Sequence, residues 1–301
     1  MNHAFLILAH QYPEHLLRLV TALNSPHSFF YIHVDKKNEI FMDAKEVKQL
    51  LSYPNVKFVE RIEVYWGGFS QVKATLILLK TAMENPAIDY FHLLSGVDYP
   101  LKSTANIHSF FQNNKHDYLT YVPDEKCYCY WLERYYFYDS KYIDARNGNK
   151  SLIQKTIGLL LIFLQRICAF AVMKLHWRIR KPIPLDYYHG SQWFSLTRSS
   201  VEYILSYVRQ NPWILKRFEY TAVSDESFFI MILMNNPKLR AKIVNNDLRL
   251  RRPDGMPFRG GDPLDEKDFE RIKQSSALWG RKFVPGVSDK LIALIEEQIR
   301  H

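Results

Sequence analysis

The sequence predicts an α/β protein with a mostly parallel central sheet that is flanked by helices. Over roughly the first hundred residues, short apolar runs typical of buried strands alternate with segments whose apolar residues recur at helical spacing. The 301 residues are 47% hydrophobic and 24% charged, which excludes disordered, collagen-like and disulfide-scaffold chains. A chain of this length can bury a large core without disulfides or a structural metal.

The first element is the continuous apolar run AFLILAH (4–10), which is typical of a strand covered on both faces. A helix is predicted at 13–24, where Pro13 stands in the first turn and Leu or Val recur at helical spacing. Further strands are predicted at 29–35, 56–59 and 90–96, and a further helix at 69–84. Functional groups of parallel sheets lie at the carboxyl ends of strands, where Asp35 and Asp98 stand.

The second half of the chain is less regular. Residues 117–150 are rich in Tyr and charge and poor in periodicity, which indicates loops and short elements. Strand character returns at 185–196. Helices are predicted at 198–211, 225–236, 265–276 and 288–300. No internal repeat or low-complexity linker is present, so we expect a single domain over 1–301.

The net charge of +9 predicts attraction to phosphates, nucleic acid or anionic lipid headgroups. The densest basic stretches are 174–181 and 238–252, and neither is a pure Lys/Arg tail, so both are expected in folded structure. A nucleic-acid-binding protein would account for the charge and for the 15% aromatic content, but no nucleic-acid motif is recognisable.

The cysteines and the first residues bear on the compartment. Cys127, Cys129 and Cys168 form an odd set with a C-x-C pair, which is a poor disulfide framework, and no Cys/His cluster has zinc-site spacing. Residues 1–10 have an apolar run of six, without a basic region or a small-residue cleavage site, so they predict a strand and no signal peptide. We expect a mature chain that begins here and works in a reducing cytoplasm.

The segment 152–180 is the most apolar part of the second half. Its longest uncharged run, 156–165, is too short to span a bilayer, and Arg166 and Lys174 interrupt the apolar residues after that run. A buried hairpin or core helix and an interfacial amphipathic helix with a basic C-terminal flank both remain open. A spanning helix is disfavoured, because charge at the bilayer centre is costly.

Several short motifs occur in order along the chain: YIHVDKK (31–37), WGGFS (66–70), LLSGVDYP (93–100), HGSQWFSLTRSSVEYI (189–204), DESFF (225–229) and GRKF (280–283). As a set they resemble the core-2/I-branching β-1,6-N-acetylglucosaminyltransferase family, which also contains the peptide O-xylosyltransferases. The resemblance runs from about residue 3 to 285. It implies a GT-A-like (Rossmann-like) fold, a UDP-sugar donor, inversion at the anomeric carbon, and no metal or other cofactor. Residues 1–115 would then be the nucleotide-binding half and 116–301 the acceptor and catalytic half.

An inverting transferase needs a base for the acceptor hydroxyl and positive charge for the departing diphosphate. Glu226 in DESFF matches the catalytic base of the family. A carboxylate at the start of a helix is also favoured by the helix dipole, and this applies at least as well to Asp225, so the residue types alone do not rank the two. The resemblance favours Glu226, with Asp225 as a neighbour or helix cap.

The donor site is predicted from a second group of residues. Asp35 is followed by Lys36 and Lys37 where a metal-binding Asp-x-Asp would have a second acid, which argues against a metal because two ligands are the usual minimum. The resemblance makes Asp35 a uridine contact; the alternative is a turn-forming Asp. It makes Arg281 and Lys282 the basic pair near the phosphates; the alternative is a solvated surface pair.

Further contacts are expected from the remaining motifs. Trp66 and Trp193 suit sugar faces, and Gly67 lets backbone approach a ligand, although either Trp is as well explained as a core residue. The resemblance places Asp98 near the donor or acceptor sugar and His10 near the nucleotide. It also calls for a further arginine, for which 249–259 offers Arg249, Arg251, Arg252 and Arg259; Arg251 and Arg259 are the preferred candidates.

We therefore expect an enzyme that transfers a sugar from a UDP-sugar to a hydroxyl of a glycan or lipid-linked saccharide. GlcNAc forming a β-1,6 branch is the first expectation and xylose the second. The chain looks like a short bacterial member with the catalytic domain only, working in the cytoplasm on surface polysaccharide, with peripheral membrane contact through 152–180 and no nucleic-acid partner.

Overall fold

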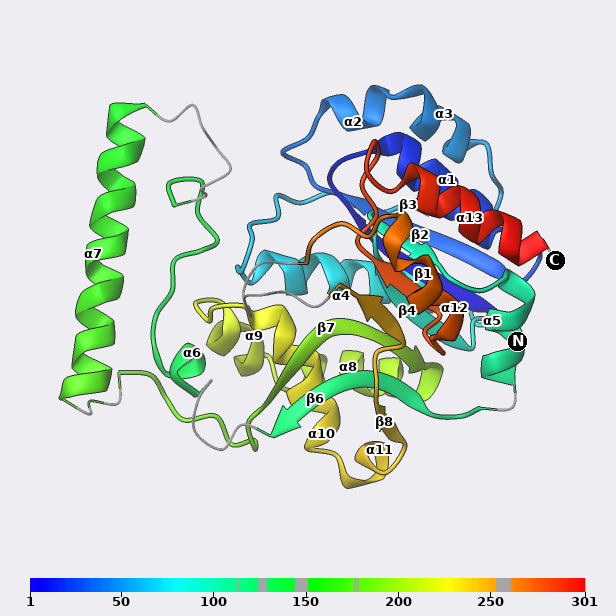
Figure 1. Ribbon diagram of the computed structural model, residues 1–301. Coiled ribbons are helices and arrows are strands. Elements are labelled where there is room, and N and C mark those ends of the chain that lie inside the picture. Colours follow the sequence, from blue (N-terminus) through cyan, green and yellow to red (C-terminus); the bar gives the residue numbers. More distant parts are fainter. Residues whose placement is uncertain are drawn as a thin grey trace.

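The computed structural model describes residues 1–112, 114–123, 129–143, 151–175, 177, 179–252 and 261–300. Its centre is a seven-stranded sheet in the order β3-β2-β1-β4-β7-β6-β8 (Figure 1). The strands are β1 (His3–Ala9), β2 (Ser28–Val34), β3 (Val56–Phe58), β4 (Tyr90–Ser95), β6 (Asp117–Pro123), β7 (Tyr188–Thr197) and β8 (Ile243–Asn245). β7 runs antiparallel to both of its neighbours, β4 and β6, and every other pairing in the sheet is parallel.

A second, three-stranded sheet has the order β5-β10-β9. Its strands are β5 (Asp98–Pro100), β9 (Arg249–Arg251) and β10 (Trp279–Arg281). β10 pairs antiparallel with β5 and parallel with β9, in a register that sets Arg281 opposite Asp98 on one side and Arg251 on the other. Three residues that the sequence nominated separately therefore lie in one row across this sheet.

Helices cover both faces of the large sheet. Alternate residues of β1 divide between the faces: Ala4 and Leu6 pack with α4, α8 and α10, while Phe5 and Ile7 pack with α1, α3 and α5. A third core cluster joins β5 to α12 and α13. The helices are α1 (Pro13–Leu23), α2 (Ile40–Asp43), α3 (Lys45–Leu51), α4 (Ser70–Met83), α5 (Thr104–Gln112), α6 (Cys129–Glu133), α7 (Leu152–Lys174), α8 (Arg198–Gln210), α9 (Trp213–Phe218), α10 (Phe228–Met234), α11 (Pro237–Arg240), α12 (Phe269–Gln274) and α13 (Asp289–Arg300), with 3-10 turns η1 (Ser224–Glu226) and η2 (Glu266–Asp268).

The predicted α/β class and the mostly parallel sheet flanked by helices are confirmed, but three element predictions were wrong. The helix predicted at 265–276 begins as the 3-10 turn η2, and its α-helical part starts at Phe269. Residues 117–123, predicted as part of an irregular region, form β6 inside the large sheet, with only Asp117, Tyr118 and Leu119 buried. Such a short buried stretch gives no detectable alternation. The predicted helix at 225–236 begins later, at Phe228, because 224–226 form a 3-10 turn.

The segment 152–180 is not a core helix. α7 stands apart from the rest of the domain (Figure 1), and only Gly158 and Ala171 of its residues are buried. Among the described residues, α7 alone is long and apolar enough to cross a membrane. The core interpretation is therefore wrong.

Four histidines gather beside the amino ends of β1 and β4. His3 Nδ1 lies 2.9 Å from His92 Nε2, and His92 Nδ1 lies 2.9 Å from the hydroxyl of Ser195. The rings of His3 and His108 stack with their centroids 4.3 Å apart, and His27 meets His108 edge-on. Burial lowers the pKa of His3 to about 3 and holds the pKa of His92 well below its ordinary value.

This cluster predicts a contribution to stability that is lost in acid. Between the lowered folded pKa values and about pH 6.5, the unfolded chain binds more protons at His3 and His92, so the free energy of unfolding falls as the pH falls. Each histidine contributes about 1.4 kcal/mol per pH unit in that window. Urea unfolding at about pH 7.5 and about pH 5 measures the slope. His3→Gln should flatten the slope relative to the wild type and the exposed His116→Gln should not; a His3→Gln slope equal to that of the wild type would contradict the prediction.

Candidate active site

The site is built around the carboxylate of Asp98, which is buried where β4 passes into β5. Its Oδ1 accepts a hydrogen bond of 2.8 Å from Arg281 Nη1, and its Oδ2 lies 3.5 Å from Arg249 Nε. Oδ2 also accepts from the backbone N–H of Ser95 at 3.0 Å. One carboxylate thus fixes two guanidinium groups that come from different strands of the small sheet. The alternative interpretation, in which Asp98 serves only to form a turn, does not explain its ion pairs with Arg281 and Arg249.

The indole of Trp193, on β7, is the flat surface for both cations. The guanidinium carbon of Arg281 lies 4.5 Å from the ring centroid, and that of Arg249 lies 5.1 Å away. Trp193 is itself buried, so both arginines pack on a ring that is shielded from solvent. The side chain of Arg281 is 21% exposed and that of Arg249 is fully buried, so Arg281 is the one of the two that an incoming anion reaches.

Arg251 extends the row of positive charge. It forms an ion pair with Asp247, and its Nη2 donates a 3.0 Å hydrogen bond to the hydroxyl of Ser191. Burial works to raise the pKa of Asp247, but Arg251 and Arg249 outweigh it and hold that pKa below its ordinary value. Asp247 is therefore a fixed anion that orients Arg251.

The two carboxylates of DESFF lie in the 3-10 turn before α10. Burial raises the pKa of Asp225 to about 7. Burial, and then the charge of Asp225, raise the pKa of Glu226 to about 8, while the nearby charge of Arg251 opposes the rise. Asp225 is buried and its Oδ1 has no hydrogen-bond partner among the described residues, whereas Glu226 is only half-buried. Glu226 is thus the more accessible carboxylate, placed beside the arginine row.

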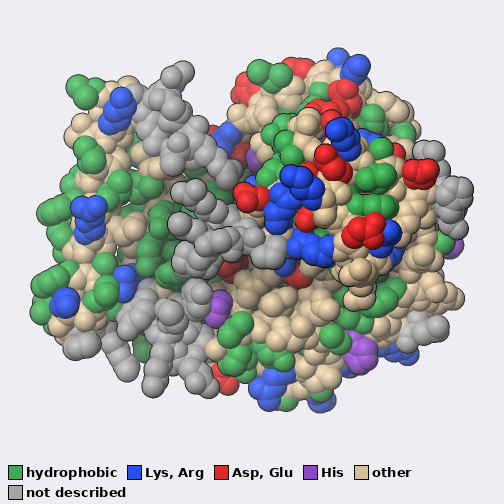
Figure 2. All heavy atoms as spheres, viewed as in Figure 1, with side chains coloured by type: hydrophobic (Ala, Val, Ile, Leu, Met, Phe, Trp, Pro, Cys, Tyr) green, Lys and Arg blue, Asp and Glu red, His purple; other side chains and the backbone are tan. Residues whose placement is uncertain are grey.

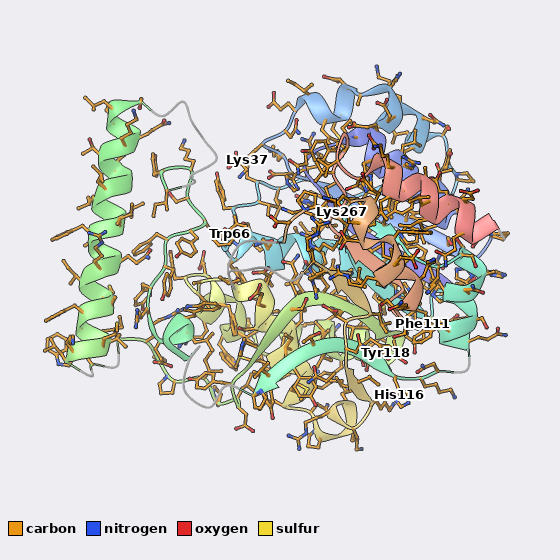
Figure 3. All side chains as sticks on the ribbon, viewed as in Figure 1. Lys37, Trp66, Phe111, His116, Tyr118 and Lys267 are labelled. Carbon is orange, nitrogen blue, oxygen red and sulfur yellow. The ribbon has the colours of Figure 1, made fainter. Side chains whose placement is uncertain are left out.

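A hydrogen bond joins this turn to the WGGFS loop. Val223, at a φ of 46°, donates its N–H to the carbonyl of Gly67 at 2.8 Å. Gly67 has a φ of 71°, and a Cβ there would lie 3.1 Å from the ring of Tyr138, so a side chain would be both strained and crowded. Trp66 beside it is 58% exposed, which excludes a core role for this indole. In Figure 3, Trp66 and Lys37 both lie on the side of the domain that faces α7.

The same loop leads into α4, whose N-terminus is capped from a distance. The carboxylate of Asp139 accepts hydrogen bonds from the backbone N–H of Ser70 at 2.8 Å and from its hydroxyl at 2.5 Å. α4 has no side-chain cap of its own, so Asp139 takes that role. The segment around 138–143 therefore borders the loop that carries Trp66.

The carboxyl ends of β1 and β2 form a separate part of the site. Asp35 Oδ1 accepts from the backbone N–H of Lys37 at 3.0 Å, and Lys37 Nζ lies 3.8 Å from Oδ2. The carbonyl of His10 accepts from the side chain of Asn38 at 2.8 Å. Arg61, which the sequence analysis did not identify, holds this loop by donating to the carbonyls of residues 34, 35 and 38.

A hollow of about 430 Å³ opens beside this loop. Its lining residues are Gln11, Tyr12, Pro13, Asn38, Ile40, Phe41, Asp43 and Ala44.

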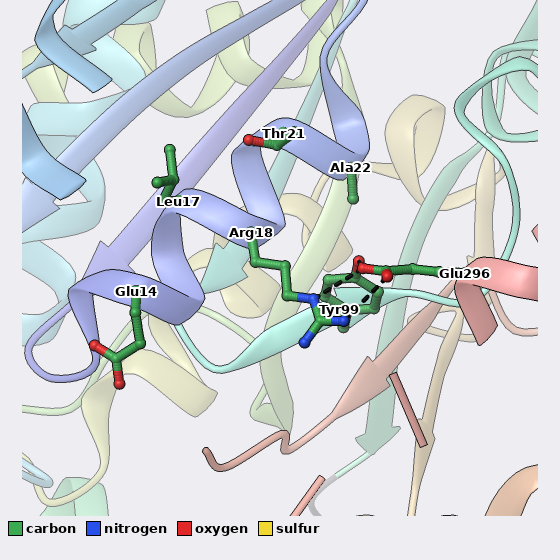
Figure 4. Close-up of a pocket in the computed structure, with 7 residues that line it drawn as sticks. All are labelled: Glu14, Leu17, Arg18, Thr21, Ala22, Tyr99 and Glu296. Atoms are coloured by element: carbon green, nitrogen blue, oxygen red, sulfur yellow. Dashed lines mark hydrogen bonds and ion pairs between the residues drawn. The ribbon is translucent and has the colours of Figure 1, made fainter. Parts of the chain in front are cut away.

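Another hollow, of about 350 Å³, lies between α1 and α13 (Figure 4). Glu296 closes it by pairing with Arg18 at 2.8 Å and accepting a 2.7 Å hydrogen bond from the hydroxyl of Tyr99. These contacts fix Tyr99, and so β5, against the two helices. The hollow itself lies outside the arginine row and serves the site only by holding the strand that begins at Asp98.

The structure thus brings most of the predicted residues together. Asp98, Trp193, Asp225, Glu226, Arg251 and Arg281 form one group. The carbonyl of Gly67, next to Trp66, accepts a hydrogen bond from Val223 at the start of the turn that carries Asp225 and Glu226, while His10 and Asp35 lie at the neighbouring strand ends. Lys282 follows Arg281 directly, and its carbonyl accepts from Leu264 at 2.9 Å. Arg252 instead pairs with Asp265 and Asp268. Arg259 lies outside the described residues.

Sequence reasoning offered Arg249 among four candidate arginines without preferring it, and it missed Asp247 and Ser191 as members of the site. The sequence does hold a pattern that indicates Arg249. Arg249 and Arg251 are two residues apart in a stretch that forms a strand, so both side chains lie on one face. Ser191 and Asp247 carry no comparable pattern. In the part of the chain that the structure describes, no three His, Cys, Asp or Glu side chains gather in a way that holds a metal.

A carboxylate able to accept a proton, beside guanidinium groups suited to a departing phosphate, defines a group-transfer site at the edge of an α/β sheet. The family model described as Core-2/I-Branching enzyme matches residues 3–273, and the chain belongs to this family of glycosyltransferases. The predicted family, the enzyme class and the α/β fold with a mostly parallel sheet are confirmed.

Curated relatives and a solved structure are also similar. The chain is 29% identical to "Xylosyltransferase 2" of Rattus norvegicus over 317 residues, which is 97% of this chain and 33% of that protein. It is 27% identical to "Xylosyltransferase 1" of Pan troglodytes, over 97% of this chain and 30% of that protein. The chain therefore spans about a third of the length of these relatives. A galactosyltransferase LgtC structure with donor and acceptor sugar analogs aligns over 98% of this chain and 95% of that one, at 12% identity and a TM-score of 0.40, a likeness too distant to carry an argument.

Proposed function

We propose that this enzyme is an inverting, metal-independent transferase that moves a sugar from a UDP-sugar to a hydroxyl of a glycan or lipid-linked saccharide. The observation that carries the proposal is the position of Glu226: half-buried, with a pKa raised to about 8, beside Arg251 and the row that continues through Arg281. A carboxylate of raised pKa holds a proton more tightly than an ordinary one, so it is a stronger base for a hydroxyl.

In this mechanism Glu226 accepts the proton of the acceptor hydroxyl while that oxygen bonds to the anomeric carbon. The bond between the anomeric carbon and the diphosphate oxygen breaks, and its electron pair leaves with UDP. Arg281, reachable and held by Asp98, and Arg251, held by Asp247, stabilise the negative charge that develops on the diphosphate. Attack from the face opposite the leaving group inverts the anomeric centre.

Metal independence is supported by two sets of charged residues, the arginine row beside Glu226 and the Asp35–Lys37 pair. Arg281 and Arg251, with Lys282 next in the chain, supply the positive charge that a divalent ion gives to a diphosphate in other transferases. Asp35 has the ammonium of Lys37 at 3.8 Å where a metal site would need a second acid.

GlcNAc is the first donor sugar proposed and xylose the second. The family description favours GlcNAc transfer, while the curated xylosyltransferase relatives favour xylose about equally. We further propose that the enzyme acts in the cytoplasm on precursors of surface polysaccharide. The activity of the much longer relatives supports only the class of reaction.

Calorimetry with UDP, UDP-GlcNAc and UDP-xylose tests donor and metal together. Binding of UDP is expected to be the same with excess EDTA and with Mn²⁺, because arginines neutralise the diphosphate. The sugar nucleotide that binds tightest should also be the one whose turnover releases UDP. Binding only with Mn²⁺ would indicate a metal site centred on Asp35, and no binding in either condition would refute the proposed UDP-sugar donor.

A further inference from the structure

α7 has two unlike faces. At 1.5 Å per residue its 23 residues extend for about 35 Å. Less exposed positions recur at 154, 158, 161, 165, 168 and 172, the spacing of one helical face. A Cβ at Gly158 would lie 2.6 Å from the carbonyl oxygen of Tyr142, so this face rests on the 138–143 segment. The inner face of α7 is therefore already occupied by protein.

The outer face is apolar and open. Its large side chains are between 48% and 81% exposed: Leu152, Leu159, Leu160, Phe163, Ile167 and Phe170. Figure 2 shows hydrophobic side chains along this helix with a few cations between them. Exposed apolar patches of this extent mark surfaces that bind a partner.

The charge around α7 identifies the chemistry of that partner. Residues 145–185 contain eight Lys or Arg and no Asp or Glu. Lys155 and Arg166 border the outer face at helical spacing, and Lys174 ends the helix. The exposed indole of Trp177 lies just beyond it in the chain. An apolar face bordered by cations, with a Trp at its end, fits the boundary between the acyl chains and the anionic headgroups of a bilayer.

α7 is fastened to the catalytic domain on both sides in sequence. After it, the buried Arg180 donates to the carbonyl of Arg134 at 2.8 Å and to the hydroxyl of Thr221 at 3.1 Å, and Arg217 donates to the carbonyl of Lys181 at 2.9 Å. Before it, the segment beneath α7 caps α4 through Asp139. Segments on both sides of the helix are thus hydrogen-bonded to the catalytic domain, and the segment under its inner face borders the Trp66 loop.

We propose that the outer face of α7 lies in the plane of an anionic membrane surface and turns the edge that carries Trp66 and Lys37 toward it. The helix lies along the surface because its inner face is covered by 138–143 and because Arg166 stands near its middle, where a spanning helix has no water. This orientation favours a lipid-linked saccharide as the acceptor, because the acceptor sugar then reaches the site from the membrane side. The inference about the acceptor rests on the proposed function.

Flotation of the full chain with phosphatidylcholine vesicles, with and without phosphatidylglycerol, tests the docking. The wild type should float with the anionic vesicles and bind neutral ones at least about tenfold more weakly, because each Lys or Arg near an anionic surface contributes about 1 kcal/mol. Phe163→Asp with Ile167→Asp should reduce anionic binding by more than about tenfold. Leu51→Asp, a change at the end of α3 at a 57% exposed side chain, should leave it unchanged. Circular dichroism and thermal midpoints establish that each variant is folded.

Several outcomes would overturn the docking. One is a wild type that floats with neither vesicle, and another is a double variant that floats normally. If the bound protein resists carbonate extraction, α7 spans the bilayer and does not lie at its surface. Self-association without lipid that the double variant abolishes, together with no flotation, would assign the face to a second copy of the chain. Glu226→Gln separates the two proposals: it should float like the wild type and fail to transfer sugar, so loss of flotation and loss of turnover test different statements.

Discussion

Glu226→Gln is expected to lower the rate of sugar transfer by about 10²- to 10⁴-fold, the usual contribution of a general base. The amide keeps the size of the side chain and cannot take a proton, so UDP affinity should stay within about twofold. Turnover is measured as UDP release with a saturating acceptor, and UDP affinity by calorimetry. A variant that turns over as fast as the wild type would remove Glu226 as the base.

The pH profile gives a second readout of the same residue. With a folded pKa of about 8, Glu226 is protonated and inactive as a base below that pH, so kcat/KM should rise with pH and level off above about 8. Asp225→Asn is the matched control: it keeps the base and removes a charge that raises the pKa of Glu226, so the rise should move to lower pH. A profile that is flat from about pH 6 to 9 would contradict the raised pKa.

Asp98→Ala is expected to destabilise the fold by about 3–5 kcal/mol, because it leaves the buried guanidinium of Arg249 without its carboxylate. Arg281 loses its 2.8 Å hydrogen bond in the same variant, so UDP binding should weaken as well. Urea unfolding measures the free energy, and UDP calorimetry measures the second effect.

Two further variants make the Asp98 result interpretable. Asp43→Ala removes an exposed carboxylate and should change the unfolding free energy by less than about 0.5 kcal/mol. Asp98→Ala combined with Arg249→Met removes both buried charges and should regain part of the loss. If Asp98→Ala unfolds at the same urea concentration as the wild type, the carboxylate does not fix the arginines.

The parts of the fold that the sequence predicted are those in which local pattern and tertiary position agree. β1, β2 and β4 are continuous apolar runs because both faces of the sheet are covered, and their carboxyl ends carry His10, Asp35 and the approach to Asp98. β6 was not predicted from the sequence because only three of its residues are buried. It forms a strand because it pairs with β7 and β8.

The candidate site divides in the same way. Motif resemblance nominated Glu226, Arg281 and Asp98 one by one. The register of β5, β10 and β9 brings residues 98, 251 and 281 into one row. No local sequence pattern encodes that register. The raised pKa of Glu226 likewise depends on burial by distant segments. The role of Arg249 depends on a contact with a residue far away in the chain.

The pairing of Pro123 with Tyr188 at the open end of β6 and β7 has a consequence for how this enzyme can diversify. The chain leaves the sheet at Pro123 and returns to it at Tyr188 on the adjacent strand, so the two ends of this excursion, which includes α7, are neighbours. Doubling the length of such an excursion adds only about 0.6 kcal/mol of closure entropy. Changes in the length or sequence of α7 would therefore leave the register of the strands that carry Trp193, Asp98 and the arginines unchanged, and under the proposed docking they would alter only the surface that the enzyme meets.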